Sequence, residues 1–440
     1  MRAILNKYKE LLKQIDPVKN TGRVSRITGL AIESTGPAAR IGEICNILSE
    51  DGNPSVVAEV VGLKDNQVML MPYGDLKGIS LGSVVEATNM PLTVPVGMDM
   101  KGRVLDGLGK PIDDRGPLNV EKYYPVDSSP VNPLKRKRIK DPLALGIRAI
   151  DGMLTCGVGQ RMGIFAGSGV GKSTLMGMIA RNTKADVNVV VLVGERGREV
   201  REFIERDLQE EGLARSVVVV ATSEQPALVR MKSAMIGTAI AEYFRDLGLN
   251  VMLLMDSLTR FAMAQREIGL ALGEPPVSRG YTPSVLALMP KLLERAGTSD
   301  KGSITGLYTV LVDGDDMNEP VTDTARGILD GHIVLSRKLA NQGHYPAIDI
   351  LASISRVMSE ITGKEHLALC NEIRSNLAVY REMEDLLHIG AYRKGSEPKM
   401  DRAVSLIESI NCFLQQRTDE VSTLEETVKM MSSIVRQGEA

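Results

Sequence analysis

Aromatic residues are scarce in this 440-residue sequence, which has no Trp, five Phe and ten Tyr, or 3% aromatics in all. Proteins that bind single-stranded nucleic acid commonly stack bases on aromatic side chains, so this composition disfavours that class. The charge balance points the same way, because 53 Lys and Arg against 55 Asp and Glu leave a net charge of −2. Nucleic-acid-binding domains are usually basic. We therefore expect no nucleic-acid partner.

Cysteines and long apolar runs are also scarce. The chain has four cysteines, far apart in sequence: Cys45, Cys156, Cys370 and Cys412. They form no CxxC pair and no metal-type spacing, and are typical of free thiols in a reducing compartment. The longest apolar runs, such as Val189 to Val193, have the length of a strand, whereas a membrane-spanning helix needs about 20 residues. With no signal-peptide pattern at the start, we expect a soluble cytoplasmic protein.

The N-terminal part of the chain contains two segments with different residue patterns. In residues 1–20, apolar residues recur at helical spacing from Ile4 to Ile15, and Pro17 ends the pattern. This predicts an amphipathic helix that either packs on its own domain or docks on a partner or membrane surface. Residues 21–92 consist of short Val- and Ile-rich runs separated by Gly, Asp and Asn. They predict a small β-barrel or sandwich.

The remainder divides into an α/β part and a helical part. A linker rich in Gly, Pro and Asp occupies residues 95–133, and Val/Ile-rich strands then alternate with helical segments over about 143–356. This alternation predicts a mainly parallel sheet covered by helices on both faces. We assign residues 93–364 to that domain with its leading linker. Residues 365–440 show only helical spacing and predict a C-terminal helical domain.

A glycine-rich motif follows the first strand of the α/β part. The segment Ala166–Ser173 reads AGSGVGKS and leads into a helical pattern, which is a Walker A loop with Ala in place of the first Gly. Its glycines let backbone N–H groups point at phosphate oxygens, and the following helix adds its positive end. Lys172 is expected to neutralise the β- and γ-phosphates of ATP, and the Ser173 hydroxyl to ligate Mg²⁺. The expected nucleotide-binding residues are Gly167, Ser168, Gly169, Val170, Gly171, Lys172, Ser173 and Thr174.

Two carboxylates end apolar strands behind this loop. Asp256 closes VMLLMD, and behind a P-loop it is expected to hold Mg²⁺ through water, although an Asp at such a position can also cap a helix. Glu195 follows VNVVVLVG, at the strand edge where ligands bind in open α/β sheets. We expect Glu195 to be the catalytic base. The alternative is a surface Glu paired with Arg196 or Arg198.

With these motifs in register, the sequence resembles the catalytic, beta-type subunits of rotary ATP synthases. It is most similar to the ATPases of type III secretion, especially flagellar export ATPases. The resemblance includes GRVLDGLGKPID, DSLTRFAMAQREIGLALGEPP and SRGYTPSVLALMPKLLERAG, and VDGDDMNEPVTDTARGILDGHIVLSR favours the secretion branch. It implies an α/β fold with a RecA-like P-loop core, an N-terminal β-barrel and a C-terminal helical domain. It also implies a homohexamer with active sites between neighbouring subunits.

The resemblance assigns roles to Glu195 and to several arginines. Glu195 matches the catalytic carboxylate of the family, and Arg356 in SISRVM matches the arginine that reaches the neighbour's nucleotide. Its planar charge suits a transferring γ-phosphate. The alternative for Arg356 is a local ion pair with Glu360. Arg196 and Arg260 match arginines near the phosphates, while the alternative is that they only organise Glu195.

The resemblance also places an aromatic residue on the adenine base. Tyr345 in GHYPAID occupies the position at which the family stacks the base, while the alternative is packing against Pro346. The Walker loop reads GKST where many synthase subunits have GKT. Since Ser and Thr both carry a hydroxyl, the expected Mg²⁺ role is unchanged.

Together these observations predict a Mg²⁺-dependent ATPase, peripheral to the inner face of the cell membrane, that energises flagellar type III protein export. Its work would be to release and unfold export substrates and chaperones at the export gate. By resemblance, its partners are a stator-like regulator at the N-terminal helix and a coiled-coil stalk near the C-terminal domain. The alternatives are a virulence-type secretion ATPase, a catalytic subunit of a rotary ATP synthase and, less expected, a RecA-like nucleic-acid translocase. A non-catalytic subunit of a mixed ring would lack Glu195.

Overall fold

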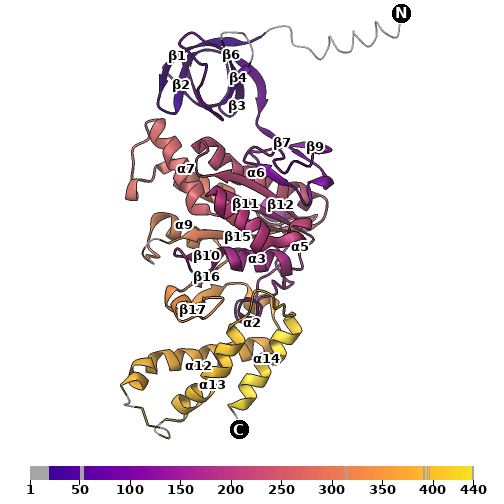
Figure 1. Ribbon diagram of the computed structural model, residues 1–440, viewed down its shortest axis with the longest axis vertical. Helices are drawn as coiled ribbons and strands as arrows, with labels where there is room; N and C mark the ends of the chain where they lie inside the picture. Colours follow the sequence, from indigo (N-terminus) through magenta and orange to yellow (C-terminus); the bar gives the residue numbers. More distant parts are fainter. Residues whose placement is uncertain are drawn as a thin grey trace, which may run out of the picture. The chain divides into compact units, whose positions relative to one another are not determined.

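The computed structural model describes residues 19–49, 54–312, 314, 316–389, 392, 393, 395 and 397–438. The predicted N-terminal amphipathic segment lies outside these residues. The chain divides into two compact units (Figure 1). Unit 1 contains the residues up to 93 together with 226–228 and 267–274, and unit 2 contains the rest.

A closed six-stranded barrel makes up most of unit 1, in the strand order β1-β2-β5-β4-β3-β6. Its strands are β1 (Thr21–Thr28), β2 (Ala31–Thr35), β3 (Glu43–Leu48), β4 (Pro54–Lys64), β5 (Gln67–Pro72) and β6 (Val84–Pro91). All neighbouring strands are antiparallel. Apolar residues alternate into the interior, where Ile32, Ile47 and Leu70 are fully buried. Of the two predicted all-β forms, the structure has the barrel.

Unit 2 is organised around a sheet with the strand order β17-β16-β10-β15-β13-β11-β12-β8. These strands are β8 (Val104–Asp106), β10 (Arg161–Ala166), β11 (Val187–Glu195), β12 (Ser216–Thr222), β13 (Asn250–Asp256), β15 (Ser303–Leu311), β16 (Gly331–Leu335) and β17 (Ile348–Ser355). Neighbours from β8 to β16 are parallel, whereas β17 is antiparallel to β16. The short β14 (Gly297–Thr298) pairs with β15, and β7 (Thr93–Val96) pairs with β9 (Lys122–Pro125).

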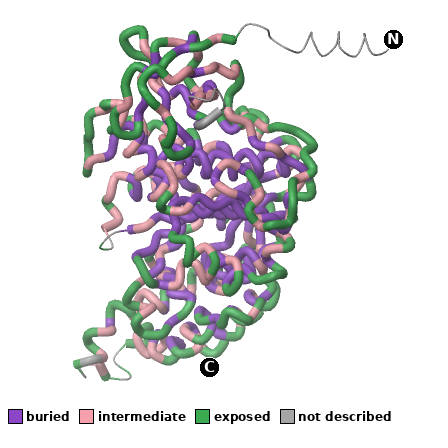
Figure 2. The backbone as a smooth tube through the Cα atoms, turned by 45° about the horizontal axis from the view of Figure 1, so that its top comes forward, coloured by how far each residue is buried: buried purple, intermediate pink, exposed green. Residues whose placement is uncertain are grey.

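The central strands are buried along most of their length, as Figure 2 shows. All nine residues of β11 are buried, as are six of seven in β13. Such continuous apolar runs are typical of parallel strands covered on both faces. The predicted mainly parallel sheet is therefore confirmed.

Helices connect the strands of unit 2 and form its C-terminal part. The connecting helices are α2 (Arg148–Met153), α3 (Lys172–Asn182), α4 (Gly197–Glu202), α5 (Gln209–Ala214), α6 (Ala227–Asp246), α7 (Leu258–Ala271), α8 (Pro283–Leu293), α9 (Pro320–Ile328), α10 (Arg337–Asn341) and α11 (Met358–Ile361). The C-terminal helices are α12 (Lys364–His388), α13 (Pro398–Leu414) and α14 (Leu424–Gln437). They share one apolar core with α2, through residues such as Met153, Phe413 and Met431. The C-terminal helices and the nucleotide-binding core are thus one packed unit.

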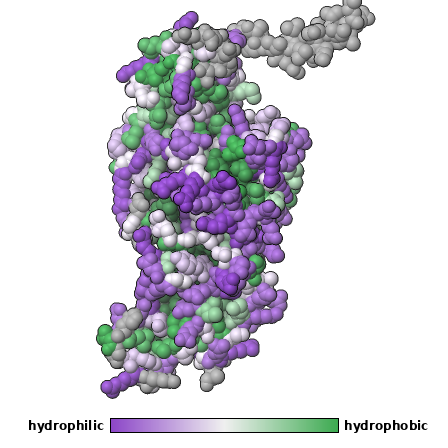
Figure 3. All heavy atoms as spheres, viewed as in Figure 1, coloured by the Kyte–Doolittle hydropathy of each residue, from purple (hydrophilic) through white to green (hydrophobic). Residues whose placement is uncertain are grey.

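Hydrophilic and hydrophobic side chains are interspersed over the face shown in Figure 3. Among the described helices, none combines the length and the apolar composition needed to cross a bilayer.

Candidate active site

The predicted P-loop connects β10 to α3. Gly169 and Gly171 have φ angles of +79° and +87°, a region that favours glycine. Helix α3 begins at Lys172 without a side-chain cap. Within the described part of the chain, the backbone N–H groups of Ser168 to Gly171 donate to no protein acceptor. Unpaired N–H groups beside a helix N-terminus form an anion cradle, which fits the phosphates of a nucleotide.

Three predicted site residues meet at one edge of the sheet. Because β10, β13 and β11 are parallel, the P-loop, Asp256 and Glu195 all follow or end strands at their carboxyl ends. The Nζ atom of Lys172 lies 2.5 Å from Oδ1 of Asp256 and 3.9 Å from Oε1 of Glu195. Thr309 donates a hydrogen bond of 2.7 Å to the same Asp256 oxygen. The structure therefore brings the lysine and both carboxylates into one small, water-poor cluster.

Electrostatics at this cluster act most strongly on Glu195. Its side chain is only 10% exposed. Burial, and then the negative charge of Asp256, raise the pKa of Glu195 to about 7, while Lys172 and Arg260 pull it down. A carboxyl with a pKa near neutrality is suited to accept a proton from water, since it is available as a base and still basic enough to take the proton.

Arg260 lies directly against Glu195. Its Nε atom is 3.7 Å from Oε1 of Glu195, and this buried nitrogen has no hydrogen-bond partner among the described residues. The close approach requires Gly194, which has a φ of +68° and whose added Cβ would lie 2.9 Å from Cδ of Arg260. Arg260 is thus placed to orient Glu195, with a donor left for another acceptor.

Arg196 lies apart from this cluster. It caps α4, its side chain is 77% exposed, and it forms an ion pair of 3.5 Å with Glu199. Arg198 pairs with Glu202 at 2.7 Å. The alternative in which Glu195 is a surface residue paired with Arg196 or Arg198 is therefore not what the structure shows.

Arg356 lies beside the amino ends of the parallel strands, whereas the P-loop follows the carboxyl end of β10. Strand β17 is antiparallel to β16, and Ser355 at its end pairs with Gly331 at the start of β16. Since β16 runs parallel to β10, the six residues of β10, about 20 Å of strand, separate Arg356 from the P-loop of its own chain. Arg356 is exposed, and the alternative partner Glu360 lies 3.5 Å from Arg138. Any nucleotide that Arg356 contacts would therefore be bound to the P-loop of a second copy of the chain.

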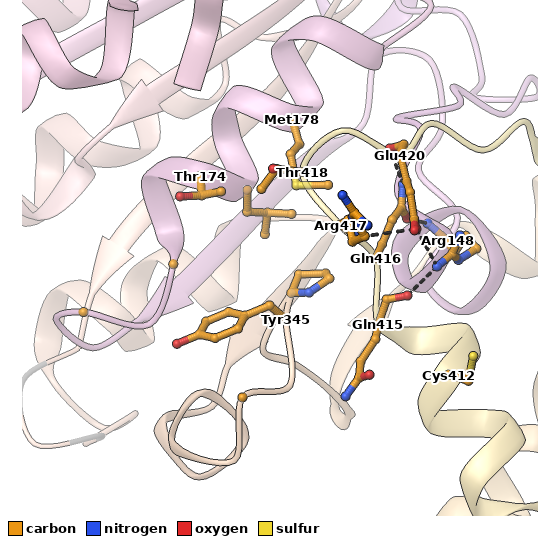
Figure 4. Close-up of a pocket in the computed structure, with 15 residues that line it drawn as sticks. Arg148, Thr174, Met178, Tyr345, Cys412, Gln415, Gln416, Arg417, Thr418 and Glu420 are labelled. Atoms are coloured by element: carbon orange, nitrogen blue, oxygen red, sulfur yellow. Dashed lines mark hydrogen bonds and ion pairs between the residues drawn. The ribbon is translucent and has the colours of Figure 1, made fainter. Parts of the chain in front are cut away.

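A cavity of about 710 Å³ adjoins the P-loop in unit 2 (Figure 4). Its walls include Gly171 and Thr174 on one side and Tyr345 and Pro346 on another. The Tyr345 side chain is half exposed, and its ring atoms lie 3.5 Å from the position that a Cβ on Gly171 would take. An aromatic face beside a phosphate cradle fits the base of a nucleotide.

The remaining wall of this cavity comes from a part of the chain that sequence reasoning missed. It consists of Arg148 at the start of α2 and of residues 415–418 and 420, which follow α13. In sequence these residues match no binding motif, and residues 415–418 and 420 lie far from the P-loop. Their contribution depends on α2 packing against the C-terminal helices, which only the folded core reveals.

The fold and the site together define a P-loop ATPase with a RecA-like core. Three family models match the chain: the ATP synthase alpha/beta family β-barrel domain over residues 24–89, its nucleotide-binding domain over 146–355, and the T3SS EscN ATPase C-terminal domain over 362–433. The chain belongs to the ATP synthase alpha/beta family, in the branch of the flagellar and type III secretion ATPases.

Relatives and solved structures match along nearly the whole chain. The chain is 56% identical to the flagellum-specific ATP synthase of Bacillus subtilis, over 97% of both chains. It is 51% identical to the type 3 secretion system ATPase of Xanthomonas euvesicatoria, over 94% of this chain and 93% of the relative. Assembled EscN from the enteropathogenic E. coli type III secretion system superposes with a TM-score of 0.88 at 45% identity, covering 94% of this chain and all of EscN. EscN in complex with its central stalk EscO gives a TM-score of 0.87.

Proposed function

We propose that this chain is a Mg²⁺-dependent ATPase whose hydrolysis energises protein export through a flagellar type III secretion apparatus. The observation that carries the proposal is the buried cluster of Lys172, Asp256 and Glu195 beside a phosphate cradle. It contains a cation for the phosphates, a metal-side carboxylate and a base, which are the parts that phosphoryl transfer to water requires.

Each group has a separate task in this proposal. The P-loop N–H groups and Lys172 bind the β- and γ-phosphates. Ser173 and Asp256 offer the oxygen donors that Mg²⁺ prefers, with Asp256 acting through water. Bound Mg²⁺ would neutralise charge on the phosphate oxygens. Glu195 accepts the proton of the attacking water, and Arg260 holds the Glu195 carboxylate in place.

The active form in this proposal is a homohexamer in which Arg356 completes the site of a neighbouring subunit. The position of Arg356 far from its own P-loop supports this arrangement, as does the similarity to assembled EscN. An arginine supplied by a neighbour stabilises the charge of the transferring phosphoryl group. Arg196, exposed at the start of α4, would meet the phosphates only after local rearrangement.

The proposed setting follows from the relatives. The complex of EscN with its central stalk EscO supports a coiled-coil stalk partner near the C-terminal helices. The further partners are a stator-like regulator at the N-terminal segment, export substrates with their chaperones, and the export gate. The chain would work in the cytoplasm, at the inner face of the membrane. The identity of 56% to a flagellum-specific ATP synthase, against 51% to a type 3 secretion system ATPase, favours the flagellar apparatus.

The proposal is tested first with the purified full-length chain. ATP hydrolysis should require Mg²⁺, stop on chelation with EDTA and return when Mg²⁺ is restored in excess. In the source cell, replacement of the chain by its Glu195→Gln variant should abolish secretion of flagellar subunits while other secretion continues. Normal flagellar assembly with loss of virulence-type secretion would instead assign the chain to the virulence branch.

A further inference from the structure

Gln416 is a buried side chain whose hydrogen-bonding groups are all used. It is 5% exposed, and its Oε1 accepts a hydrogen bond of 2.8 Å from the backbone N–H of Arg148. Its Nε2 donates to the carbonyls of Gly146, at 2.8 Å, and Glu420, at 2.9 Å. One amide thus ties the segment before α2 to the loop after α13. Because both N–H donors of this amide are used within the protein, the side chain has no donor left for a bound ligand.

The backbone of Gln416 makes a fourth connection. Its N–H donates a hydrogen bond of 2.9 Å to the carbonyl of Tyr345. Tyr345 supplies the aromatic wall of the 710 Å³ cavity. The residues on either side of Gln416 in sequence, Gln415 and Arg417, line the opposite side. Gln416 therefore connects the loop after α13 directly to the segment that carries Tyr345.

Arg148 fastens the same loop from its other side. Its Nε donates to the carbonyl of Phe413 at 3.1 Å, and its Nη2 contacts the carbonyl of Gln415 and lies 3.1 Å from a carboxylate oxygen of Glu420. The side chain is 14% exposed. Figure 4 shows Arg148 at the cavity edge, bonded to Gln415 and Glu420. A planar guanidinium can reach several acceptors at once, whereas a lysine ammonium cannot reproduce this fork.

The segment before α2, which carries this network, is itself held by hydrogen bonds. The two carboxylate oxygens of buried Asp151 each accept a hydrogen bond of 2.8 Å, from the N–H groups of Leu145 and Gly146. Farther along the loop, Arg181 at the end of α3 donates to the carbonyl of Thr418 at 2.9 Å. The loop after α13 is therefore held at several points by main-chain contacts that do not depend on its own side chains.

From this network we infer that Gln416 and Arg148 are positioning residues that set the base-binding half of the nucleotide cavity. They hold the loop formed by residues 415–420 against Tyr345, so that a base is enclosed between the two walls. Among the described residues, neither side chain forms a hydrogen bond to the P-loop. The inference rests on the proposed ATPase function. It implies that these two residues affect the affinity for the nucleoside part of ATP but not the affinity for the triphosphate part.

The test compares the wild type with Gln416→Glu in the full-length chain. Glu keeps the acceptor for Arg148 but cannot donate, so the carbonyls of Gly146 and Glu420 lose their partner. We expect the KM for ATP to rise about tenfold, the effect of leaving the buried Gly146 carbonyl unpaired, with kcat changed less than about twofold. The inhibition constant of inorganic tripolyphosphate, which has no base, should stay unchanged. The matched control is Gln437→Glu, the same change at an exposed position in α14.

Every outcome decides the question. An equal loss of affinity for ATP and tripolyphosphate, or an unchanged KM, overturns the inference. If Gln416→Glu does not fold, as judged by thermal unfolding and gel filtration, Arg148→Lys replaces it and should show the same selective rise in KM. Failure of both to fold would assign the network to general stability and also overturn the inference. A wild-type chain that does not hydrolyse ATP would instead refute the proposed function.

Discussion

Lys172 and Asp256 form a buried ion pair, in which Nζ lies 2.5 Å from Oδ1 and both side chains are largely shielded from water. The pair joins the P-loop to the end of β13, and Glu195 lies on its flank at 3.9 Å from the same ammonium group. Phosphates entering the cradle would compete with both carboxylates for Lys172. The cluster is thus arranged so that nucleotide binding changes the charge surrounding Glu195.

The substitution Glu195→Gln removes the base while keeping the size of the side chain. We expect kcat to fall by about 10²–10⁴-fold, the range for loss of general base catalysis, while ATP still binds. Steady-state hydrolysis and equilibrium binding of ATP measure the two effects. Glu202→Gln is the control, because Glu202 is paired with Arg198 on the surface. Full hydrolysis by the Glu195 variant would show that another group prepares the water.

The pH dependence follows from the raised pKa of Glu195, which is about 7 and is caused mainly by burial and secondly by Asp256. A base acts only when it is deprotonated, so activity is lost as pH falls through this value. In the kcat/KM profile, which reports ionisations of the free enzyme, we expect a plateau above neutrality and a fall of about tenfold per pH unit below it. A flat profile across this range would rule out Glu195 as the titrating base.

Substitution of Tyr345 tests the base-binding wall. Stacking of a base on an aromatic ring contributes about 1–3 kcal/mol, so Tyr345→Ala should raise the KM for ATP by about 5–150-fold. Tyr345→Phe keeps the ring and should stay near the wild-type KM. If Tyr345→Ala leaves the KM unchanged, the base binds elsewhere.

Stability depends on a buried ion pair remote from the site. Arg295 donates to both carboxylate oxygens of Glu242, at 3.0 and 2.7 Å, and to the carbonyl of Val126. Because the side chains are 3% and 5% exposed, Arg295→Met should destabilise the protein by about 3–5 kcal/mol through the unpaired Glu242.

Thermal and denaturant unfolding measure this loss. The double variant Arg295→Met with Glu242→Leu should recover much of it, since no buried charge is left. Lys429→Met is the control, because Lys429 is 74% exposed and its pair with Glu425 is worth about 0–1 kcal/mol. Equal effects of the buried and surface substitutions would contradict this account.

The cluster of Lys172, Asp256 and Glu195 could be predicted from sequence because each carboxylate ends an apolar strand and Lys172 belongs to the loop that follows one. Once the strands are parallel, their carboxyl ends share one edge, and local motifs become spatial neighbours. The residue pattern alone left two all-β forms open, since closure of the barrel depends on the pairing of β1 with β6, which no local pattern records. The family resemblance selected the barrel.

The wall of the cavity that faces Tyr345 could not be predicted in the same way. Arg148 and Gln416 are 268 residues apart in sequence, and their contacts are largely with the main chain. A main-chain carbonyl has no sequence signature, so neither the partner nor its distance can be read from residue types. The placement of Arg356 likewise depends on the antiparallel direction of β17, whereas alternating strands and helices predict parallel neighbours.

The most direct test of the shared-site account mixes two inactive variants, Glu195→Gln and Arg356→Ala, by co-expression. Loss of a trans-acting arginine should cost about 10³–10⁵-fold in kcat, so each variant alone should hydrolyse ATP very slowly. In mixed rings with head-to-tail contacts, about a quarter of the sites combine an intact Glu195 with an intact neighbouring Arg356. The account predicts that the mixture regains about this fraction of wild-type activity. A mixture as inactive as its components, in rings shown to contain both variants, would contradict it.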